Sequence, residues 1–303
     1  TYETTVAKEH RLSALLYYYM SSEQRMNKDI DAKAETLRSM YAIPIRYQGL
    51  SGRITYGFRD TYFMDVNFGY TGSENFQSGH RFGFFPSVAV GWIPTQYEFM
   101  QRGLPWLNFL KIRASYGTVG NDRLTDERFP YLTLMVDGDG GGWGSSSGYI
   151  TEERVGANNL RWEKAKKADL GIEGRLFNEK LQFVVDFFQD KRDGIYQRRS
   201  QIPSYVGLTQ MPFGNVGKMK SYGSDGNISF PQDFGKDMTL TLRGNFTYSA
   251  NKVENWEQAF QPYDYQNYTG YVNNAFRGYI ALGLFRDEQD VAQSPKQTFG
   301  EYM

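Results

Sequence analysis

The feature that most constrains the fold is a strict alternation of apolar and polar residues, sustained over about ten positions. The stretch TYFMDVNFGY, residues 61–70, has an apolar side chain at every second position. These side chains are Tyr62, Met64, Val66, Phe68 and Tyr70. Because successive side chains of a strand point to opposite sides, they share one face of an extended strand. That face has a tyrosine at each end and apolar residues between, so it meets either a protein core or lipid.

The same alternation recurs along most of the chain. It is found in residues 51–58, 83–92, 108–117, 168–177, 181–190 and 239–249, and further strands are predicted at 12–20 and 221–230. Soluble strands average about five or six residues, whereas about nine to eleven tilted residues cross a bilayer. The runs of about ten residues therefore favour strands that span a membrane.

The predicted connections alternate between short and long. Only Arg-Asp separates strand 51–58 from strand 61–70, and only Asn-Glu-Lys separates 168–177 from 181–190. The long connections are predicted at 71–82, 118–167 and 191–220, and residues 93–107 form a medium link where a short one is due. Outer-membrane barrels have tight periplasmic turns and long external loops. The sequence therefore predicts a transmembrane antiparallel β-barrel with long extracellular loops and interfacial tyrosines. The alternative is a soluble all-β protein that buries its apolar face.

The composition excludes several other classes of protein. The 34 basic and 34 acidic residues cancel, which gives no reason to expect a nucleic-acid partner. The absence of cysteine excludes a disulfide scaffold and thiolate metal sites. A hydrophobic fraction of 40% is typical of soluble proteins, but a barrel exposes only alternate residues to lipid and never appears hydrophobic on average.

Six stretches resemble, in the same order, the barrel of the SusC/RagA family of TonB-dependent outer-membrane transporters. They are residues 52–76, 82–100, 104–122, 158–196, 214–230 and 283–300. One departure is GYTGSENF, where the family more often has an arginine and an Asp-Gly-Ser-Ser run. Residues 159–170 contain Glu, Lys and Ala, which favour a short amphipathic helix. The resemblance instead implies a loop that descends into a strand.

The resemblance implies that residues 1–303 are about ten strands of a larger barrel, without a plug domain and without the C-terminal closing strands. The whole protein would lie in the outer membrane of a Gram-negative bacterium and import a glycan or a peptide. A SusD-like surface lipoprotein would capture the substrate, and the TonB system would supply energy through the plug. No catalytic residue and no cofactor are implied. The alternatives are a passive channel, a structural barrel, or a soluble carbohydrate-binding β-protein.

Two groups of residues are candidates for contact with a transported molecule. The polar strand faces carry candidate lumen-lining charges at Lys111, Arg113, Asp169, Glu173, Asp186 and Arg243. The alternative for each charge is cross-strand pairing within the wall. The long loops carry aromatic side chains suited to sugar or peptide contact, namely Trp143, Tyr149, Trp256, Tyr263, Tyr265 and Tyr268. The alternative is that these rings pack within their own loops.

Two other motifs are better explained as loops. The run GSSSG, residues 144–148, matches a nucleophile elbow at Ser146, but His10 and His80 both precede the serine, whereas that fold places histidine after it. The run DGDGGG, residues 137–142, resembles the start of a calcium loop, but glycine occupies the position where a bidentate glutamate closes such a loop. Two distant histidines without cysteine give a zinc site almost no support.

Overall fold

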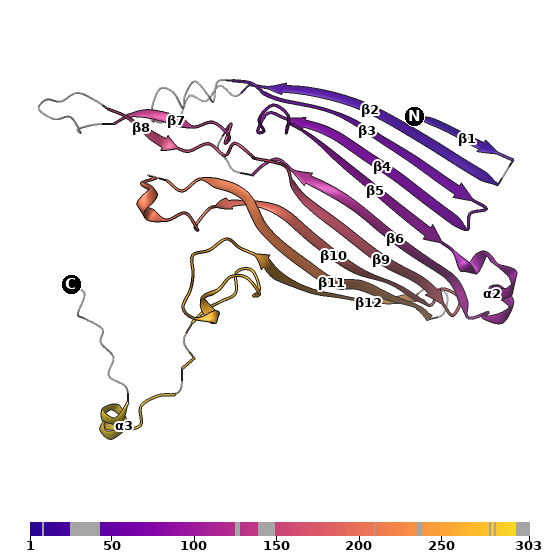
Figure 1. Ribbon diagram of the computed structural model, residues 1–303. Coiled ribbons are helices and arrows are strands. Elements are labelled where there is room, and N and C mark those ends of the chain that lie inside the picture. The colour runs from indigo at the N-terminus through magenta and orange to yellow at the C-terminus, as the bar shows by residue number, and fades with distance from the viewer. Residues whose placement is uncertain are drawn as a thin grey trace, which may run out of the picture. The chain divides into compact units, whose positions relative to one another are not determined.

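The computed structural model describes residues 1–7, 9–24, 43–124, 128–138, 149–208, 210–234, 238–278, 280–281 and 283–294. The chain forms two compact units, Thr1–Asn273 and Asn274–Met303. The first unit is built on a ten-stranded sheet (Figure 1). The described part of the second unit contains the short helix α3 (Glu288–Gln293), which Asp287 caps by accepting a hydrogen bond from the Asp290 amide at 2.8 Å. No helix in these described ranges is long and apolar enough to cross a membrane.

The large sheet is antiparallel throughout and follows the chain order β1-β2-β3-β4-β5-β6-β9-β10-β11-β12. Its strands are β1 (Tyr2–Val6), β2 (His10–Glu23), β3 (Ile45–Phe58), β4 (Tyr62–Ser73), β5 (Phe82–Trp92), β6 (Leu107–Asn121), β9 (Glu163–Leu176), β10 (Leu181–Arg198), β11 (Phe213–Phe234) and β12 (Met238–Asn255). A separate hairpin of β7 (Leu134–Gly138) and β8 (Tyr149–Arg154) lies in the connection between β6 and β9. The helical turns in the first unit are η1 (Pro94–Gln96), α2 (Glu98–Gly103), η2 (Ser204–Val206) and η3 (Asp264–Gln266).

The strands extend beyond the predicted apolar runs, which corrects the predicted long connections. Most of the connection predicted at 191–220 is strand, because β10 has 18 residues and β11 has 22. The connection predicted at 118–167 contains the β7–β8 hairpin, and the connection at 71–82 shrinks to the residues between β4 and β5. The main-chain ladder continues where apolar alternation stops, because ladder hydrogen bonds do not depend on the side chains. The expected strand after residue 159 is confirmed, since β9 begins at Glu163.

The register gives the sheet one apolar face and one polar face. On β4, Val66 lies opposite Ile54 on β3 and Val88 on β5, whereas Asn67 lies opposite Arg53 and Ser87. We call the face that carries Val66 the outer face and the face that carries Asn67 the inner face. The outer side chains remain accessible, with Val66 at 39%, Leu170 at 45% and Phe187 at 50% exposure. No described element of the first unit covers this apolar surface.

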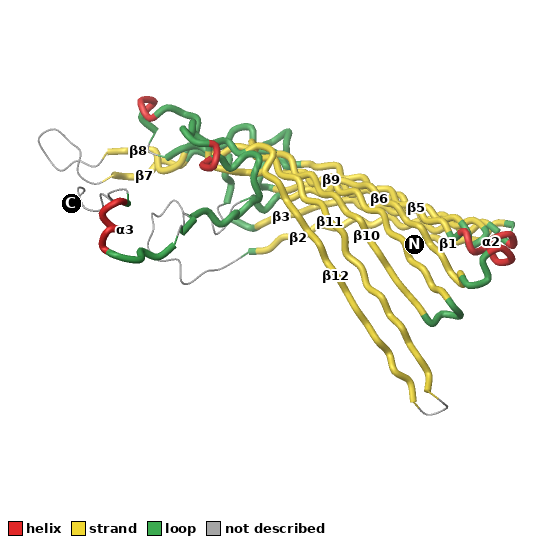
Figure 2. The backbone as a smooth tube through the Cα atoms, turned by 90° about the horizontal axis from the view of Figure 1, so that it is seen from below, coloured by secondary structure: helices red, strands yellow, loops and turns green. Residues whose placement is uncertain are grey.

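The two ends of the sheet differ in their connections (Figure 2). At one end the strands are joined by tight turns, and the link between β5 and β6 forms η1 and α2. In the β3–β4 turn, Arg59 and Asp60 both have positive φ, at 51° and 50°. Arg59 also donates to the Glu9 carboxylate at 2.8 Å, and this hydrogen bond raises the pKa of the guanidinium. The long connections lie at the opposite end, which we call the external end.

The best-buried side chains lie in the loops at the external end. The cluster consists of Phe76, Ala157, Leu160 and Trp162, and we call it the loop core. Phe76 is 0% and Leu160 is 1% exposed. The inner-face residue Phe85 packs against the loop core, with its ring 5.1 Å from that of Trp162. The loop core therefore fastens two long connections to the inner side of the sheet.

Candidate functional site

The six charges predicted to line a lumen all lie on the inner face. Lys111 on β6 is directly opposite Glu173 on β9, and Ser115 is opposite Asp169. Arg113 and Asp186 are both opposite Gly171, one from each side of β9. Along β10 and β11, Asp186 is opposite Asp225, and Ser229 on β11 is opposite Arg243 on β12. Cross-strand partners point to the same side of a sheet, so the register brings these side chains onto one surface.

Arg113 and Asp186 form an ion pair that reaches across an intervening strand. Arg113 Nη2 donates to both carboxylate oxygens of Asp186 at 2.6 Å. Gly171 on β9 lies beneath the bridge, and a Cβ there would be 2.3 Å from Arg113 Nε and from Asp186 Oδ1. The Asp186 side chain is 17% exposed and that of Arg113 is 41% exposed. Glycine therefore leaves the room in which β6 and β10 are linked by charge.

Further ion pairs continue the charged surface toward the external end. Lys167 Nζ lies 3.7 Å from Asp190 Oδ2, and Arg192 Nε lies 3.3 Å from Glu163 Oε1. All four residues share the inner face, because Lys167 is opposite Asp190 and Arg192 is opposite Ala165. The sequence analysis missed these pairs because Lys167 in the first pair, and both Glu163 and Arg192 in the second, lie in strand extensions beyond the apolar runs. Opposite charges at two-residue spacing on β9 and β10 were the available signal.

Removal of one partner of the Arg113–Asp186 pair is expected to destabilise the barrel wall. Asp186→Leu should lower the free energy of unfolding by about 1–2 kcal/mol. The burial of this ion pair is intermediate, and its contribution should therefore fall between those of fully exposed and fully buried pairs. The charge swap R113D/D186R should restore most of the loss. The measurement is chemical unfolding of the full-length protein in detergent, with Arg243→Gln as a control on the same face. Equal losses for Asp186→Leu and Arg243→Gln would contradict this role.

The candidate loop aromatics that the structure describes lie in one loop after β12. Tyr263 and Tyr265 stack with ring centroids 5.5 Å apart and are 58% and 64% exposed. Trp256 and Tyr268 form a second pair at 6.0 Å. The loop is tied to β12, because the Val253 amide donates to the Tyr271 carbonyl at 2.9 Å. The rings therefore pack within their loop, and Tyr263, Tyr265 and Tyr268 each remain more than half exposed.

Other candidates from the sequence fall largely outside the described residues. Trp143, Ser146 and the segment 139–148 lie outside them, and for Tyr149 only the backbone place in β8 is described. His10 Nδ1 is hydrogen-bonded to the Tyr56 hydroxyl at 2.7 Å on the outer face. Within the described ranges, no group of three or more histidine, aspartate or glutamate side chains is placed to hold a metal ion.

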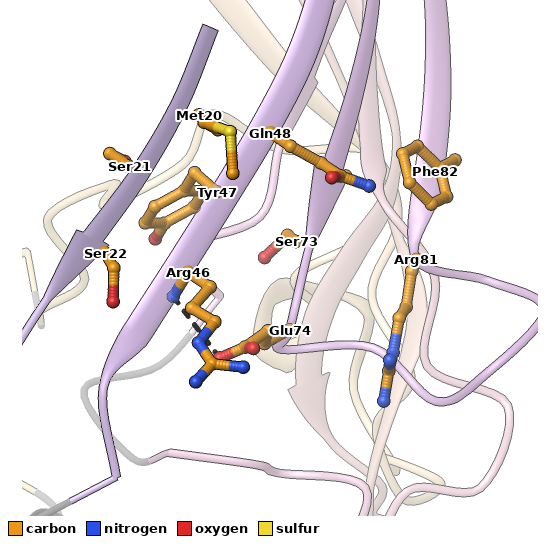
Figure 3. Close-up of a pocket in the computed structure, with 11 residues that line it drawn as sticks. Met20, Ser21, Ser22, Arg46, Tyr47, Gln48, Ser73, Glu74, Arg81 and Phe82 are labelled. Carbon is orange, nitrogen blue, oxygen red and sulfur yellow. Dashed lines mark hydrogen bonds between the residues drawn. The ribbon is translucent and has the colours of Figure 1, made fainter.

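A cavity of about 570 Å³ lies at the external ends of β2 to β5 (Figure 3). Two of its lining residues are hydrogen-bonded, since the Arg46 amide donates to the Glu74 carboxylate at 3.3 Å. Its apolar lining includes Met20 and Phe82, and the register places these two residues in one row on the outer face, joined by Gln48 and Gly72. The sequence did not predict this cavity, because its lining comes from four strands whose relative register the sequence leaves open.

The chain matches a known family over nearly its whole length. The model of the family described as "TonB dependent receptor-like, beta-barrel" matches residues 12–300. A TonB-dependent receptor of Formosa agariphila, named P39, is 27% identical over 88% of this chain and 24% of its own length. The TonB-dependent receptor SusC of Bacteroides thetaiotaomicron is also 27% identical, over 67% of this chain and 20% of its own length. The chain therefore spans about a quarter or less of these relatives.

Solved structures share the fold. The RagAB peptide importer in its "open-open" state aligns with a TM-score of 0.69 and 21% identity, over 84% of this chain and 29% of the other. Another RagAB structure aligns with a TM-score of 0.64 and 20% identity. The expected resemblance to SusC and RagA is confirmed, and with it the antiparallel membrane barrel, of which the ten strands form an open part. The chain belongs to the TonB-dependent receptor β-barrel family, which comprises outer-membrane transporters and not enzymes.

Proposed function

We propose that this chain forms part of the barrel wall of a SusC-like transporter that imports an oligomeric nutrient across the outer membrane of a Gram-negative bacterium. The carrying observation is the family match over residues 12–300, on a sheet whose inner face bears paired charges of both signs. The whole transporter would add a plug domain, the closing strands, the TonB system and a SusD-like lid. These elements complete the uptake path that the wall encloses.

The inner face is suited to a large, polar and nearly neutral cargo. Its ion pairs place positive and negative groups side by side, so no single-sign field extends along the wall. Lys111, Asp169, Glu173 and Arg243 share this face with the pairs and would offer donors and acceptors along the path. A glycan or a peptide meets such a surface through many weak hydrogen bonds. We therefore assign these residues to the lumen.

The stacked tyrosines in the loop after β12 are proposed as a cargo contact. The Y263A/Y265A variant should weaken cargo binding to the full-length transporter about tenfold, because each exposed ring packs on an apolar face of a sugar or peptide. Calorimetric titration with the imported oligomer measures this loss. Y263F/Y265F is the matched control and should keep the affinity, since the stacking surface remains. An unchanged affinity in Y263A/Y265A would contradict the assignment.

Energised import is tested in cells that carry the full-length transporter. Uptake of fluorescently labelled glycan and peptide pools is compared with and without the TonB system. The proposal expects that loss of TonB abolishes uptake and that a surface lipoprotein copurifies with the transporter. Uptake that persists without TonB would instead establish a passive channel. The labelled pool that is taken up identifies the cargo as a glycan or a peptide.

A further inference from the structure

The outer face carries a second ordered feature, a row of lysines that crosses four neighbouring strands. Lys166 on β9 is directly opposite Lys191 on β10, Lys191 is opposite Lys220 on β11, and Lys220 is opposite Lys252 on β12. Lys164 and Lys218 lie in the next row toward the external end, on either side of Asp193. We call these residues the lysine patch: Lys164, Lys166, Lys191, Lys218, Lys220 and Lys252.

Register and parity place the lysine patch on the side of the sheet that faces lipid. Lys166 alternates with Lys167, whose partner Asp190 is on the inner face, and it shares its side of β9 with Leu170. Lys220 is two residues beyond Tyr222, a step of about 7 Å toward the external end. Toward the other end of the strands, the same side of β10 carries Gln189, Phe187, Val185 and Phe183, none of which is charged. The patch therefore lies next to Tyr222, where the uncharged part of the outer face ends, and this is the position at which lysines meet lipid headgroups.

The charges of the lysine patch are only partly balanced by the protein. Asp193 lies 3.9 Å from Lys166 and 4.0 Å from Lys218. Within the described part of the chain, no acidic side chain forms an ion pair with Lys191, Lys220 or Lys252. Like charges that lie directly opposite on neighbouring strands destabilise a sheet. An anion from outside the protein would relieve three such oppositions in the row.

A cavity of about 580 Å³ adjoins the patch at Lys164 and Asp193. Arg161 and His80 add basic groups to its wall, and the outer-face rings of Phe82 and Phe84 add apolar surface. Phe82 and Phe84 are 43% and 55% exposed. The cavity therefore combines basic groups with apolar rings, the two kinds of surface that the charged headgroup and the acyl chains of a lipid would contact.

We propose that the lysine patch binds phosphate-bearing lipid headgroups of the external leaflet. Lysines at a membrane surface are attracted to anionic lipid, and their long stems lie along apolar surface while the ammonium group reaches the phosphates. Lys220 Nζ lies 5.6 Å from the centre of the Tyr222 ring, a cation–π distance, so its charge is held beside an aromatic ring of the outer face. A partner protein over the barrel mouth would meet the loops and the inner face, whereas the patch faces sideways into the bilayer.

The test uses the full-length transporter in neutral detergent, titrated with diphosphorylated lipid A and, separately, with lipid A from which phosphatase has removed the phosphates. Native mass spectrometry counts the bound lipid. The K191Q/K220Q variant removes the centre of the row, and K167Q/K180Q is the control with two lysines from the inner face and the opposite end. K191Q/K220Q should lower the affinity for diphosphorylated lipid A at least tenfold, while the control should match the unmodified protein.

A second comparison uses only the unmodified protein and does not depend on any variant. Its affinity for lipid A should fall at least tenfold when the phosphates are removed, and millimolar inorganic phosphate should not displace the diphosphorylated lipid. Equal affinity for both lipids would overturn the proposal. Displacement by inorganic phosphate would also overturn it, in favour of a site for the free ion. A third result would also overturn the proposal: K191Q/K220Q could lose a copurifying acidic protein while its lipid binding stays unchanged. The patch would then be assigned to that protein partner.

Discussion

Val66→Arg should destabilise the full-length barrel by about 2–4 kcal/mol, the cost of arginine on a lipid-facing strand at the bilayer midplane. Val66 is midway along β4 between Tyr62 and Tyr70, and its outer-face neighbours are Ile54 and Val88. The substituted guanidinium would be held among apolar side chains and lipid, without a carboxylate partner. The measurement is the midpoint of chemical unfolding of the transporter in phospholipid bilayers, followed by tryptophan fluorescence.

The neighbouring position supplies the control for this prediction. Asn67→Arg places the same side chain on the inner face, opposite Arg53 and Ser87. Like-charge opposition to Arg53 costs only a few tenths of a kcal/mol, because water reaches the inner surface. The two variants therefore compare the cost of arginine on the lipid-facing side of one strand with its cost on the water-facing side. Equal costs at the two positions would contradict the assignment of the faces.

Trp162→Ala should have the largest effect in the external loops, with a loss of about 3–5 kcal/mol of local stability. Trp162 is 8% exposed, and its ring lies 5.1 Å from both Phe76 and Phe85. Its indole N–H also donates to the Arg81 carbonyl at 3.0 Å. Truncation leaves a cavity in the loop core and removes one of the two hydrogen bonds that the Arg81 carbonyl accepts, the other coming from the Ser73 amide. The two connections should then separate from the inner face.

Limited proteolysis of the full-length transporter in membranes measures this opening. The variant should be cleaved faster within residues 74–81 and 155–162. Trp162→Phe should lose about 1 kcal/mol, because it keeps the ring contacts and removes only the hydrogen bond. Trp106→Ala is the matched control, since Trp106 is 46% exposed at the opposite end of the sheet. Cleavage of Trp162→Ala no faster than of Trp106→Ala would show that the loop core does not hold these connections.

Local pattern was enough to predict nine of the ten strands of the large sheet and their two faces, but not β1 or the β7–β8 hairpin. The period of two in residues 61–70 appears in β4 with the expected sides, and the charges at Lys111, Arg113 and Asp186 share the opposite face. Side chains alternate strictly along a strand, so the sequence alone predicts which residues share a face. The ends of the strands were not predicted, because β10 and β11 continue on main-chain hydrogen bonds after apolar alternation has ended.

Contacts between strands distant in sequence required the tertiary structure. The sequence indicates that Arg113 and Asp186 are charged, but their bond depends on β6 and β10 both pairing with β9 and on the space left by Gly171. The lysine row likewise exists only because three strand registers bring Lys166, Lys191, Lys220 and Lys252 into line.

The sequence by itself therefore determined the barrel class, the direction of each face and the family. Only the tertiary structure decided which side chains meet, because register is set by the pairing of whole strands and a shift of one residue would exchange the two faces.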